Sequence, residues 1–321
     1  MPPILFFHYP KFSLFILAIN AVLVLKPVNP WPLFRSFFQL WYGIFDLSHN
    51  LGPKAQGIFE KENFLCILAM HPHGVIPLHA FLWSGFCDQY LPSLYGVGAT
   101  TNIAQRLPIV RQILLWLSAG SAGREVIREA MTVKSHNLFI LPGGVAEIFL
   151  SKRFPHNTNS HKHVIKGKRY GLMKLALQTG AHIIPCYVFG ATQLFDQIAT
   201  FSATQGVSHD NDRQESTLGM WVECLSRKIR GGITFYWGQY YSPLPHAAKL
   251  TLVLGDPIAP FPRACMNNYT INRKKRTCAT HLNPSNEQVE ELLQRYTDSL
   301  HLLFEQYKHQ AGYGNDVLEI I

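Results

Sequence analysis

Charged side chains are scarce in this sequence, and several common motifs are missing from it. Asp, Glu, Lys and Arg make up only 15% of the 321 residues, whereas hydrophobic residues make up 47% and aromatic residues 12%. This composition favours a membrane-associated protein over a freely soluble one. No internal repeat is visible, and the glycines at Gly96 and Gly98 are too few for a dinucleotide-binding fingerprint.

Acidic residues are in deficit. Asp and Glu number 20 against 29 Lys and Arg, which gives a formal net charge of +9. A basic balance of this kind suits an anionic membrane surface or an anionic co-substrate such as coenzyme A. Because no nucleic-acid recognition motif accompanies the charge, we expect no nucleic acid as a partner.

The six cysteines form no CxxC pair and follow no regular spacing. Free thiols in a reducing compartment are the simplest interpretation. His161 and His163 lie close together, but no Cys or carboxylate at ligand spacing joins them, so we expect no metal site.

The longest apolar run lies near the N-terminus, over residues 12–24, between Lys11 and Lys26. Counted from residue 4 to residue 25, it reaches the roughly 20 residues that span a bilayer. A transmembrane helix, a re-entrant hairpin and a buried core helix all fit this run. A signal peptide fits less well, because no small-residue cleavage site follows.

We therefore predict a hydrophobic membrane segment over residues 1–42 and an α/β domain over residues 43–321. Aromatic residues that suit a membrane interface are concentrated between residues 31 and 42. Lys26 and Arg35 outweigh Lys11 on the short flanks, which places the main body in the cytosol if the segment spans the membrane.

The most informative stretch covers residues 64–74, with the sequence FLCILAMHPHG. Its apolar part predicts a strand that is buried on both faces of a mostly parallel sheet, and it stops at His71, Pro72, His73 and Gly74. Ligands gather beyond the carboxyl ends of such strands, so a rigid turn there presents imidazole to a cleft. A polar loop whose histidines only satisfy nearby carbonyls is the alternative, but two histidines in one rigid turn favour function.

A second apolar run, over residues 138–141, leads into a glycine turn that ends at Glu147. If the two strands are parallel, His73 and Glu147 leave the sheet at the same edge. Further strands are predicted at residues 182–189, 233–237 and 250–254, and helices at residues 108–116, 124–134 and 170–178. A capping box at Ser285 and Gln288 opens a helix through Lys308 with one apolar face.

Basic residues gather between residues 151 and 171, and Lys168 and Arg169 are candidates for binding the phosphates of coenzyme A. A solvated loop is the alternative for the histidine-rich half of this stretch. Residues 200–219 predict a mobile polar loop, and residues 265–283 form another polar insertion.

In these motifs the sequence resembles the diacylglycerol O-acyltransferase type 2 family, which includes monoacylglycerol and wax-ester acyltransferases. The resemblance rests on the turn at residues 71–74, the Gly143-Gly144-x-x-Glu147 block and residues 168–176, which lie in the family's order. It implies a glycerolipid-acyltransferase-like α/β fold. It also implies transfer of an acyl chain from acyl-CoA, a co-substrate rather than a cofactor, to diacylglycerol or a related lipid alcohol.

The resemblance further implies an endoplasmic reticulum membrane location with the active site facing the cytosol, and the lipid droplet surface as a second location. Membrane lipids are the expected surroundings, and a homo-oligomer is compatible with the pattern. A monoacylglycerol or long-chain alcohol acceptor, an inactive lipid-binding homologue and a metal-dependent hydrolase remain as alternatives.

The expected chemistry needs a general base and stabilisation of a tetrahedral oxyanion. We assign the base to His73 and a supporting role to His71, and we expect amides of Gly143 and Gly144 to face the oxyanion. Broader glycerolipid acyltransferases place an Asp five positions after their His, but here that position is Leu78. We therefore expect Glu147 to orient the ring of His73.

Overall fold

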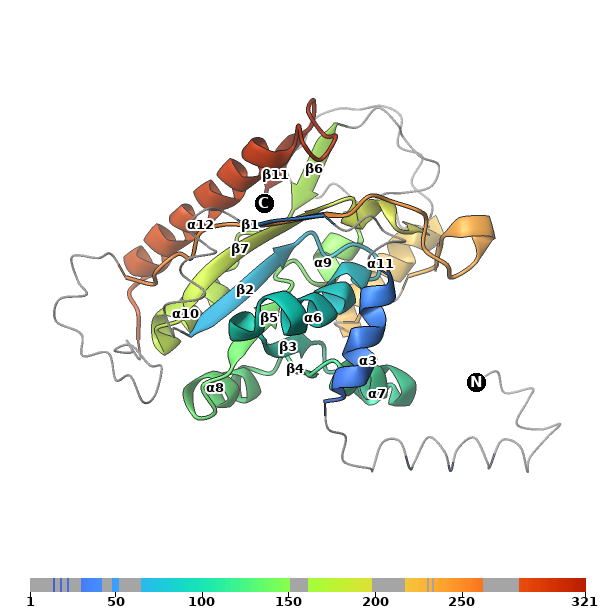
Figure 1. Cartoon of the computed structure of the whole chain (residues 1–321), viewed down its shortest axis with the longest axis horizontal. Coiled ribbons are helices and arrows are strands. Elements are labelled where there is room, and N and C mark those ends of the chain that lie inside the picture. The colour runs from blue at the N-terminus through green and yellow to red at the C-terminus, as the bar shows by residue number, and fades with distance from the viewer. Residues whose placement is uncertain are drawn as a thin grey trace.

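A seven-stranded sheet forms the centre of the structure, a computed structural model (Figure 1). The described residues are 14, 18, 22, 30–41, 48–51, 65–150, 161–197, 217–229, 231–232, 234–261 and 283–321. In order across the sheet, the strands are β1 (Ser48–Leu51), β10 (Thr251–Leu254), β7 (His182–Phe189), β2 (Cys66–His71), β5 (Asn137–Ile140), β3 (Gly96–Thr100) and β4 (Ala119–Ser121).

The sheet is mostly parallel, as predicted. Strands β7, β2, β5, β3 and β4 run parallel to one another, whereas β10 is antiparallel to β7 and parallel to β1. Because β2 and β5 are parallel neighbours, the turns that follow them leave the sheet at the same edge.

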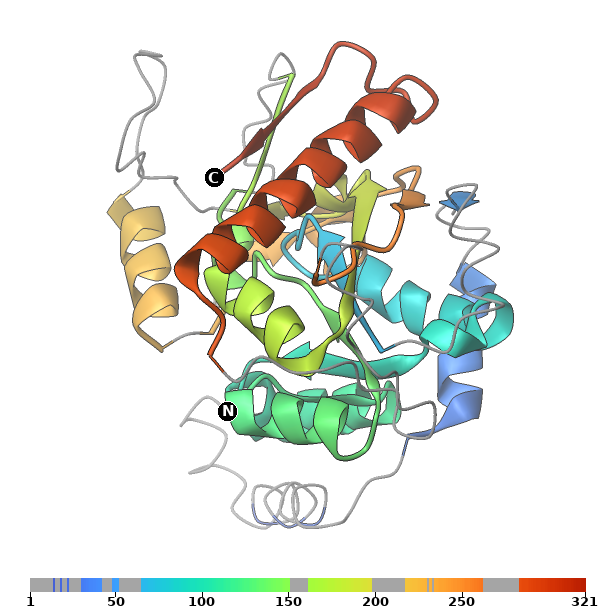
Figure 2. The same cartoon turned by 90° about the vertical axis from the view of Figure 1, so that its left-hand side faces the viewer.

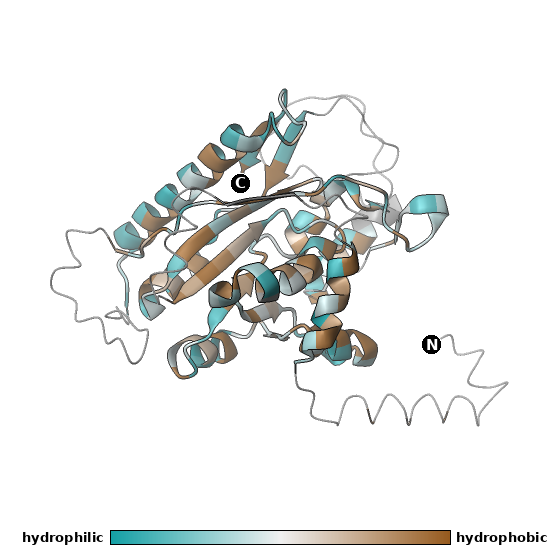
Figure 3. Ribbon diagram, in the orientation of Figure 1, coloured by the Kyte–Doolittle hydropathy of each residue, from teal (hydrophilic) through white to brown (hydrophobic). Residues whose placement is uncertain are grey.

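Strand β2 is apolar up to its last residue, His71, because both of its faces are covered. Ile67 and Ala69 belong to the core on one face, and Leu68 and Met70 belong to the core on the other. Figure 3 shows the hydrophobic colouring along β2 and β7 and alternating bands on the outer helices. A continuous apolar run is the pattern expected of a central parallel strand.

Helices cover both faces of the sheet. The first face carries α8 (Arg124–Thr132), α10 (Tyr170–Thr179) and α12 (Asn286–Tyr307), and Figure 2 shows α10 and α12 side by side in front of the sheet. The second face carries α6 (Leu78–Tyr90), with α3 (Pro32–Phe37) and α7 (Pro108–Trp116) beside it.

The capping box predicted at the start of the last helix is confirmed. The side chain of Ser285 accepts from the backbone of Gln288, and the side chain of Gln288 accepts from the backbone of Ser285. The apolar face of α12 packs on the sheet, which buries Leu292, Tyr296 and Leu300.

Further elements complete the described part of the chain. They are α9 (Val145–Ile148), α11 (Thr217–Ile229), the parallel pair β6 (Lys162–Ile165) and β11 (Val317–Ile320), and the antiparallel pair β8 (Asp196–Gln197) and β9 (Tyr236–Trp237). The 3₁₀ turns are η1 (Phe38–Trp41), η2 (Pro92–Leu94), η3 (Ala104–Arg106), η4 (Ala191–Gln193) and η5 (Gln239–Tyr241).

Two sequence predictions need correction here. The polar segment 200–219 was predicted to be a loop, but its last residues begin α11. The strand predicted over residues 233–237 is reduced to the two residues of β9. The insertion at residues 265–283 lies almost wholly outside the described residues.

The predicted membrane segment is only partly covered by the structure. Of residues 12–24, only Leu14, Ala18 and Val22 are described, and within the described residues no helix is both long enough and apolar enough to cross a bilayer. Helix α3 and η1, at the end of segment 1–42, pack on the α/β body. There the amide of Trp31 donates to the carbonyl of Trp116, and the ring of Phe38 lies 5.9 Å from that of Phe81.

Candidate active site

His71 is the last residue of β2 rather than the first residue of the turn. Side chains alternate along a strand, so its ring lies on the same face as Ile67 and Ala69, towards α12. The ring is completely buried, with Nδ1 2.7 Å from Oε1 of Glu147 and Nε2 3.0 Å from the hydroxyl of Tyr296. His71 is therefore held on both ring nitrogens.

Glu147, in the short helix α9, connects three separate segments. Its carboxylate contacts the ring of His71 and accepts from the backbone amide of His73 at 2.6 Å and from that of Lys166 at 2.8 Å. Burial by itself would raise the pKa of Glu147, but the charge and hydrogen bond of His71 and the two amides lower it below its ordinary value. The group is thus a buried carboxylate.

The two glycines before α9 make room for this carboxylate. A Cβ atom on Gly143 would lie 1.7 Å from Cδ of Glu147, so no side chain fits there. Gly144 has φ +53° and ψ −143°, a conformation that essentially only glycine adopts. The Gly144 amide, which we expected to face an oxyanion, donates instead to the carbonyl of Leu141 at 3.2 Å.

His73 is held differently from His71. Its backbone is bonded to Glu147, and its ring Nδ1 lies 2.8 Å from the carbonyl oxygen of Gly74. That carbonyl can only accept, so Nδ1 carries the proton and Nε2 carries the lone pair. Nε2 has no hydrogen-bond partner among the described residues.

The surroundings of His73 favour the neutral ring. Burial lowers its pKa below 6.5, although the carbonyl of Gly74 and the charge of Glu147 partly oppose this. Gly74 has φ +67°, and a Cβ there would lie 3.0 Å from the carbonyl oxygen of Ala191, so the turn needs a glycine at this position.

These contacts correct the role that we expected for Glu147. The sequence correctly places Glu147 beside both histidines, but its carboxylate bonds the ring of His71 and only the backbone of His73. The reason is geometric: His71 continues β2 and faces α12, whereas His73 lies beyond the strand. The carbonyl of Gly74 orients the ring of His73.

Basic side chains lie next to Glu147. Nη2 of Arg169 donates to the carbonyl of Gly143 at 2.6 Å, while Lys168 is exposed. Burial lowers the pKa of Lys166, and the charges of Arg169 and Arg227 lower it further. We call Lys166, Arg169 and Arg227 the basic cluster. Lys166 and Arg169 lie in the basic stretch noted in the sequence at residues 151–171, whereas Arg227 was not predicted.

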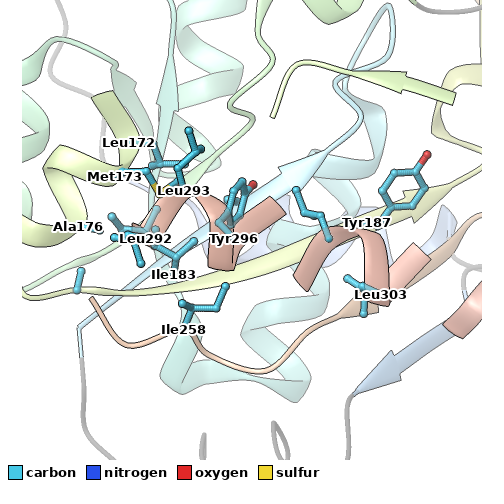
Figure 4. Close-up of a cluster of buried hydrophobic side chains, with 14 of the residues drawn as sticks. Leu172, Met173, Ala176, Ile183, Tyr187, Ile258, Leu292, Leu293, Tyr296 and Leu303 are labelled. Carbon is cyan, nitrogen blue, oxygen red and sulfur yellow. The ribbon is translucent and has the colours of Figure 1, made fainter. Parts of the chain in front are cut away.

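Tyr296 is the clearest residue that sequence reasoning missed. Figure 4 shows it on α12 among leucines and other apolar side chains, where its hydroxyl group needs a partner. It was assigned only to the apolar face of the last helix. A tyrosine within a stripe of leucines was the available signal, but its partner His71 lies 225 residues away in sequence.

Comparison with known proteins finds similarity over most of the chain. Residues 50–321 match the family model described as diacylglycerol acyltransferase. Human acyl-CoA wax alcohol acyltransferase 1 is 26% identical over 285 residues, covering 85% of this chain and 75% of that protein. Diacylglycerol O-acyltransferase 2 of Xenopus laevis is 26% identical over 308 residues, covering 92% and 73%. Mouse diacylglycerol O-acyltransferase 2-like protein 6 is 27% identical over 297 residues, covering 89% and 76%.

The matched region contains every residue of the site described above, from His71 to Tyr296. The chain belongs to the diacylglycerol acyltransferase family.

Proposed function

We propose that this protein is a membrane-bound, acyl-CoA-dependent O-acyltransferase that esterifies diacylglycerol to triacylglycerol, with His73 as general base. The observation that carries the proposal is the state of the His73 ring. Its Nδ1 is held by the carbonyl of Gly74, its Nε2 has no partner among the described residues, and its pKa is lowered by burial. A neutral, oriented imidazole is what a base acting near pH 7 requires.

The reaction needs no covalent intermediate on the protein. Nε2 of His73 takes the proton of the acceptor hydroxyl as the oxygen attacks the thioester carbonyl carbon. When the tetrahedral intermediate collapses, the C–S bond breaks and the coenzyme A sulfur leaves with the proton from His73. The ester and free coenzyme A are released, and His73 is neutral again.

Glu147 and His71 position the base in this scheme. The carboxylate of Glu147 fixes the backbone amide of His73, and its bond to His71 ties the end of β2 to α9. Such fixed geometry matters because catalytic groups act well only when held close to the reacting atoms.

The basic cluster, together with exposed Lys168, is our candidate for the phosphates of acyl-CoA. Arg169 carries guanidinium donors that suit phosphate oxygens, and Lys166 lies close enough to it for their charges to interact. The amide of Lys166 and the side chain of Arg169 both contact the Glu147 turn, so coenzyme A bound there lies next to the base.

We also propose that the protein works at a membrane, the cytosolic face of the endoplasmic reticulum, and on lipid droplets. Exposed apolar side chains on α3, η1 and α7 support this, among them Leu33, Leu40 and Ile109. A truncated variant lacking residues 1–28 keeps α3, which packs on the body. This truncated variant should bind vesicles more weakly than the full chain, and equal binding would exclude the removed run as the attachment.

The acceptor is best tested with a panel. Membranes containing the protein receive labelled oleoyl-CoA with dioleoylglycerol, monooleoylglycerol, oleyl alcohol or a sterol. We expect triacylglycerol as the main product. A wax ester as the main product would favour the second candidate, a wax alcohol acyltransferase, which the name of the human relative suggests. No transfer to any acceptor would indicate an inactive lipid-binding homologue.

A further inference from the structure

A third histidine lies beside the turn that carries His71 and His73. His79 is in the first turn of α6, and its side chain is 1% exposed. The backbone carbonyl of Pro72 faces its ring, and the charges of His73 and Glu147 both act on it. His79 therefore covers the turn from the α6 side, on the face of the sheet opposite α12.

Within the described residues, neither ring nitrogen of His79 has a hydrogen-bond partner. The carbonyl of Pro72 is near, but it does not meet the geometry of a hydrogen bond. His71, equally buried, is bonded on both nitrogens. A buried polar group without partners lowers stability, and such groups persist where function requires them.

The charge state of His79 is well defined. Burial lowers its pKa to about 3, and the charge of His73 acts in the same direction, while Glu147 and the carbonyl of Pro72 act against them. The ring is therefore neutral near pH 7. A neutral imidazole offers one N–H donor and one acceptor, so it can pair with an ester carbonyl or a hydroxyl.

From this placement we propose that His79 binds a polar group of the acyl acceptor next to the reacting hydroxyl. In a glyceride that group is an ester carbonyl or a second hydroxyl, whereas a plain long-chain alcohol has neither. The inference rests on the proposed acyl transfer at His73 and adds a substrate class to it. His79 makes the site selective for glycerides over simple alcohols.

The test compares two acceptors in one assay. For the wild type, His79→Leu and His79→Gln, kcat/KM is measured with dioleoylglycerol and with oleyl alcohol at saturating oleoyl-CoA. The ratio of the two values should fall roughly tenfold in His79→Leu, the loss expected for one buried hydrogen bond. His79→Gln should recover part of the ratio, because its amide can also donate and accept.

Thermal unfolding separates this role from a structural one. Because Leu leaves no unpaired nitrogen in the site, the melting temperature of His79→Leu should stay level or rise. The matched control is His182→Leu. It removes a half-buried histidine, also with a lowered pKa, from the first residue of β7, which pairs with Cys66 at the end of β2 far from the site. The control should keep the wild-type acceptor ratio.

An unchanged ratio of the two kcat/KM values in His79→Leu would overturn the proposal. If both values fall equally and the melting temperature also falls, His79 has a structural role only. If the wild type transfers no acyl group to either acceptor, the proposed function fails. Whether His79 binds the acceptor is then tested by ligand-induced stabilisation. Dioleoylglycerol in mixed micelles should then raise the melting temperature of the wild type but not of His79→Leu. A wild type that dioleoylglycerol fails to stabilise would overturn the proposal.

Discussion

Among the histidine–carboxylate contacts of the described residues, two networks can be compared directly, and they differ mainly in burial. In the inner network, Glu147 bonds His71, which also bonds Tyr296, and the side chains of Glu147 and His71 are almost completely buried. In the outer network, defined as His161, His163 and Asp316, the carboxylate bridges two histidines of which one is 60% exposed.

The comparison of the two networks shows how burial changes the importance of a histidine–carboxylate contact. Distances in the two networks are alike, at 2.7 to 2.8 Å between histidine nitrogen and carboxylate oxygen. Asp316 lies in the turn before β11, and its contact with His163 connects that turn to β6. Water can reach this position and replace a hydrogen-bond partner that is removed. Glu147 also binds two backbone amides at the site, where water has little access, so its loss should affect both folding and catalysis.

The largest expected effect is that of His73→Ala, which removes the base and leaves both networks intact. Acyl transfer should fall by about 10²- to 10⁴-fold, the usual contribution of a general base. The melting temperature should change little, because the ring makes a single hydrogen bond to Gly74. Turnover within a few fold of the wild type would remove His73 from the mechanism.

Glu147→Gln should have the next largest effect, because it leaves His71 and two amides without their anionic partner. We expect a loss of about 3 to 5 kcal/mol in the free energy of unfolding, the range measured when one partner of a buried pair is removed. Turnover should also fall much more than the affinity for acyl-CoA.

The control for this prediction is the double variant with His73→Ala, assayed in parallel. If Glu147 acts through His73, the double variant should be hardly slower than His73→Ala alone, because residues acting as one unit are not additive. Fully multiplicative losses would show that Glu147 serves folding only.

Tyr296→Phe should have a moderate effect. It removes the hydroxyl that bonds Nε2 of His71, which we expect to cost about 1 kcal/mol of stability and a few fold in turnover. Tyr187→Phe is the matched control, since the Tyr187 hydroxyl bonds His163 of the outer network instead. Equal turnover losses in the two variants would mean that the inner network has no special link to catalysis.

Asp316→Asn should have the smallest effect, about 0.5 to 1 kcal/mol, because the pair is partly solvated. Burial alone would raise the pKa of Asp316, but the hydrogen bonds and charges of His161 and His163 outweigh burial and lower this pKa to below 3.8. A carboxylate whose pKa is lower in the folded than in the unfolded state stabilises the fold at pH values above its unfolded-state pKa. This stabilisation is lost as the pH falls through the folded-state pKa. The difference from the wild type in urea unfolding should therefore shrink below about pH 4, and an increase there would contradict this account.

Much of the sheet could be predicted because its central strands are continuous apolar runs. Strand β7 coincides with the predicted residues 182–189, and the capping box located the start of α12. Helix α6 was missed because residues 78–90 are apolar nearly all round and show no amphipathic stripe. The pairing of β6 with β11 was missed because nothing in either segment specifies a partner about 150 residues away.

Three members of the site were predicted from the sequence, but Tyr296 and the hydrogen bonds that connect the members were not. His71, His73 and Glu147 meet because the turns after two parallel strands share one edge, which the sequence pattern predicts. Which histidine receives the carboxylate depends on whether β2 ends before or after His71. A shift of one residue along a strand moves a side chain to the other face of the sheet. The apolar pattern does not locate the end of a strand to within one residue.

The most direct test of the account is the pH dependence of kcat/KM for acyl transfer to dioleoylglycerol, measured between pH 4 and 8 under conditions in which the protein stays folded. The account requires a neutral His73 whose pKa is lowered by burial. The value of kcat/KM should therefore rise with pH as one proton is lost, with a midpoint below 6.5, and then stay level to pH 8. A midpoint above 6.5, or a rate that falls as pH rises through this range, would contradict His73 as the base.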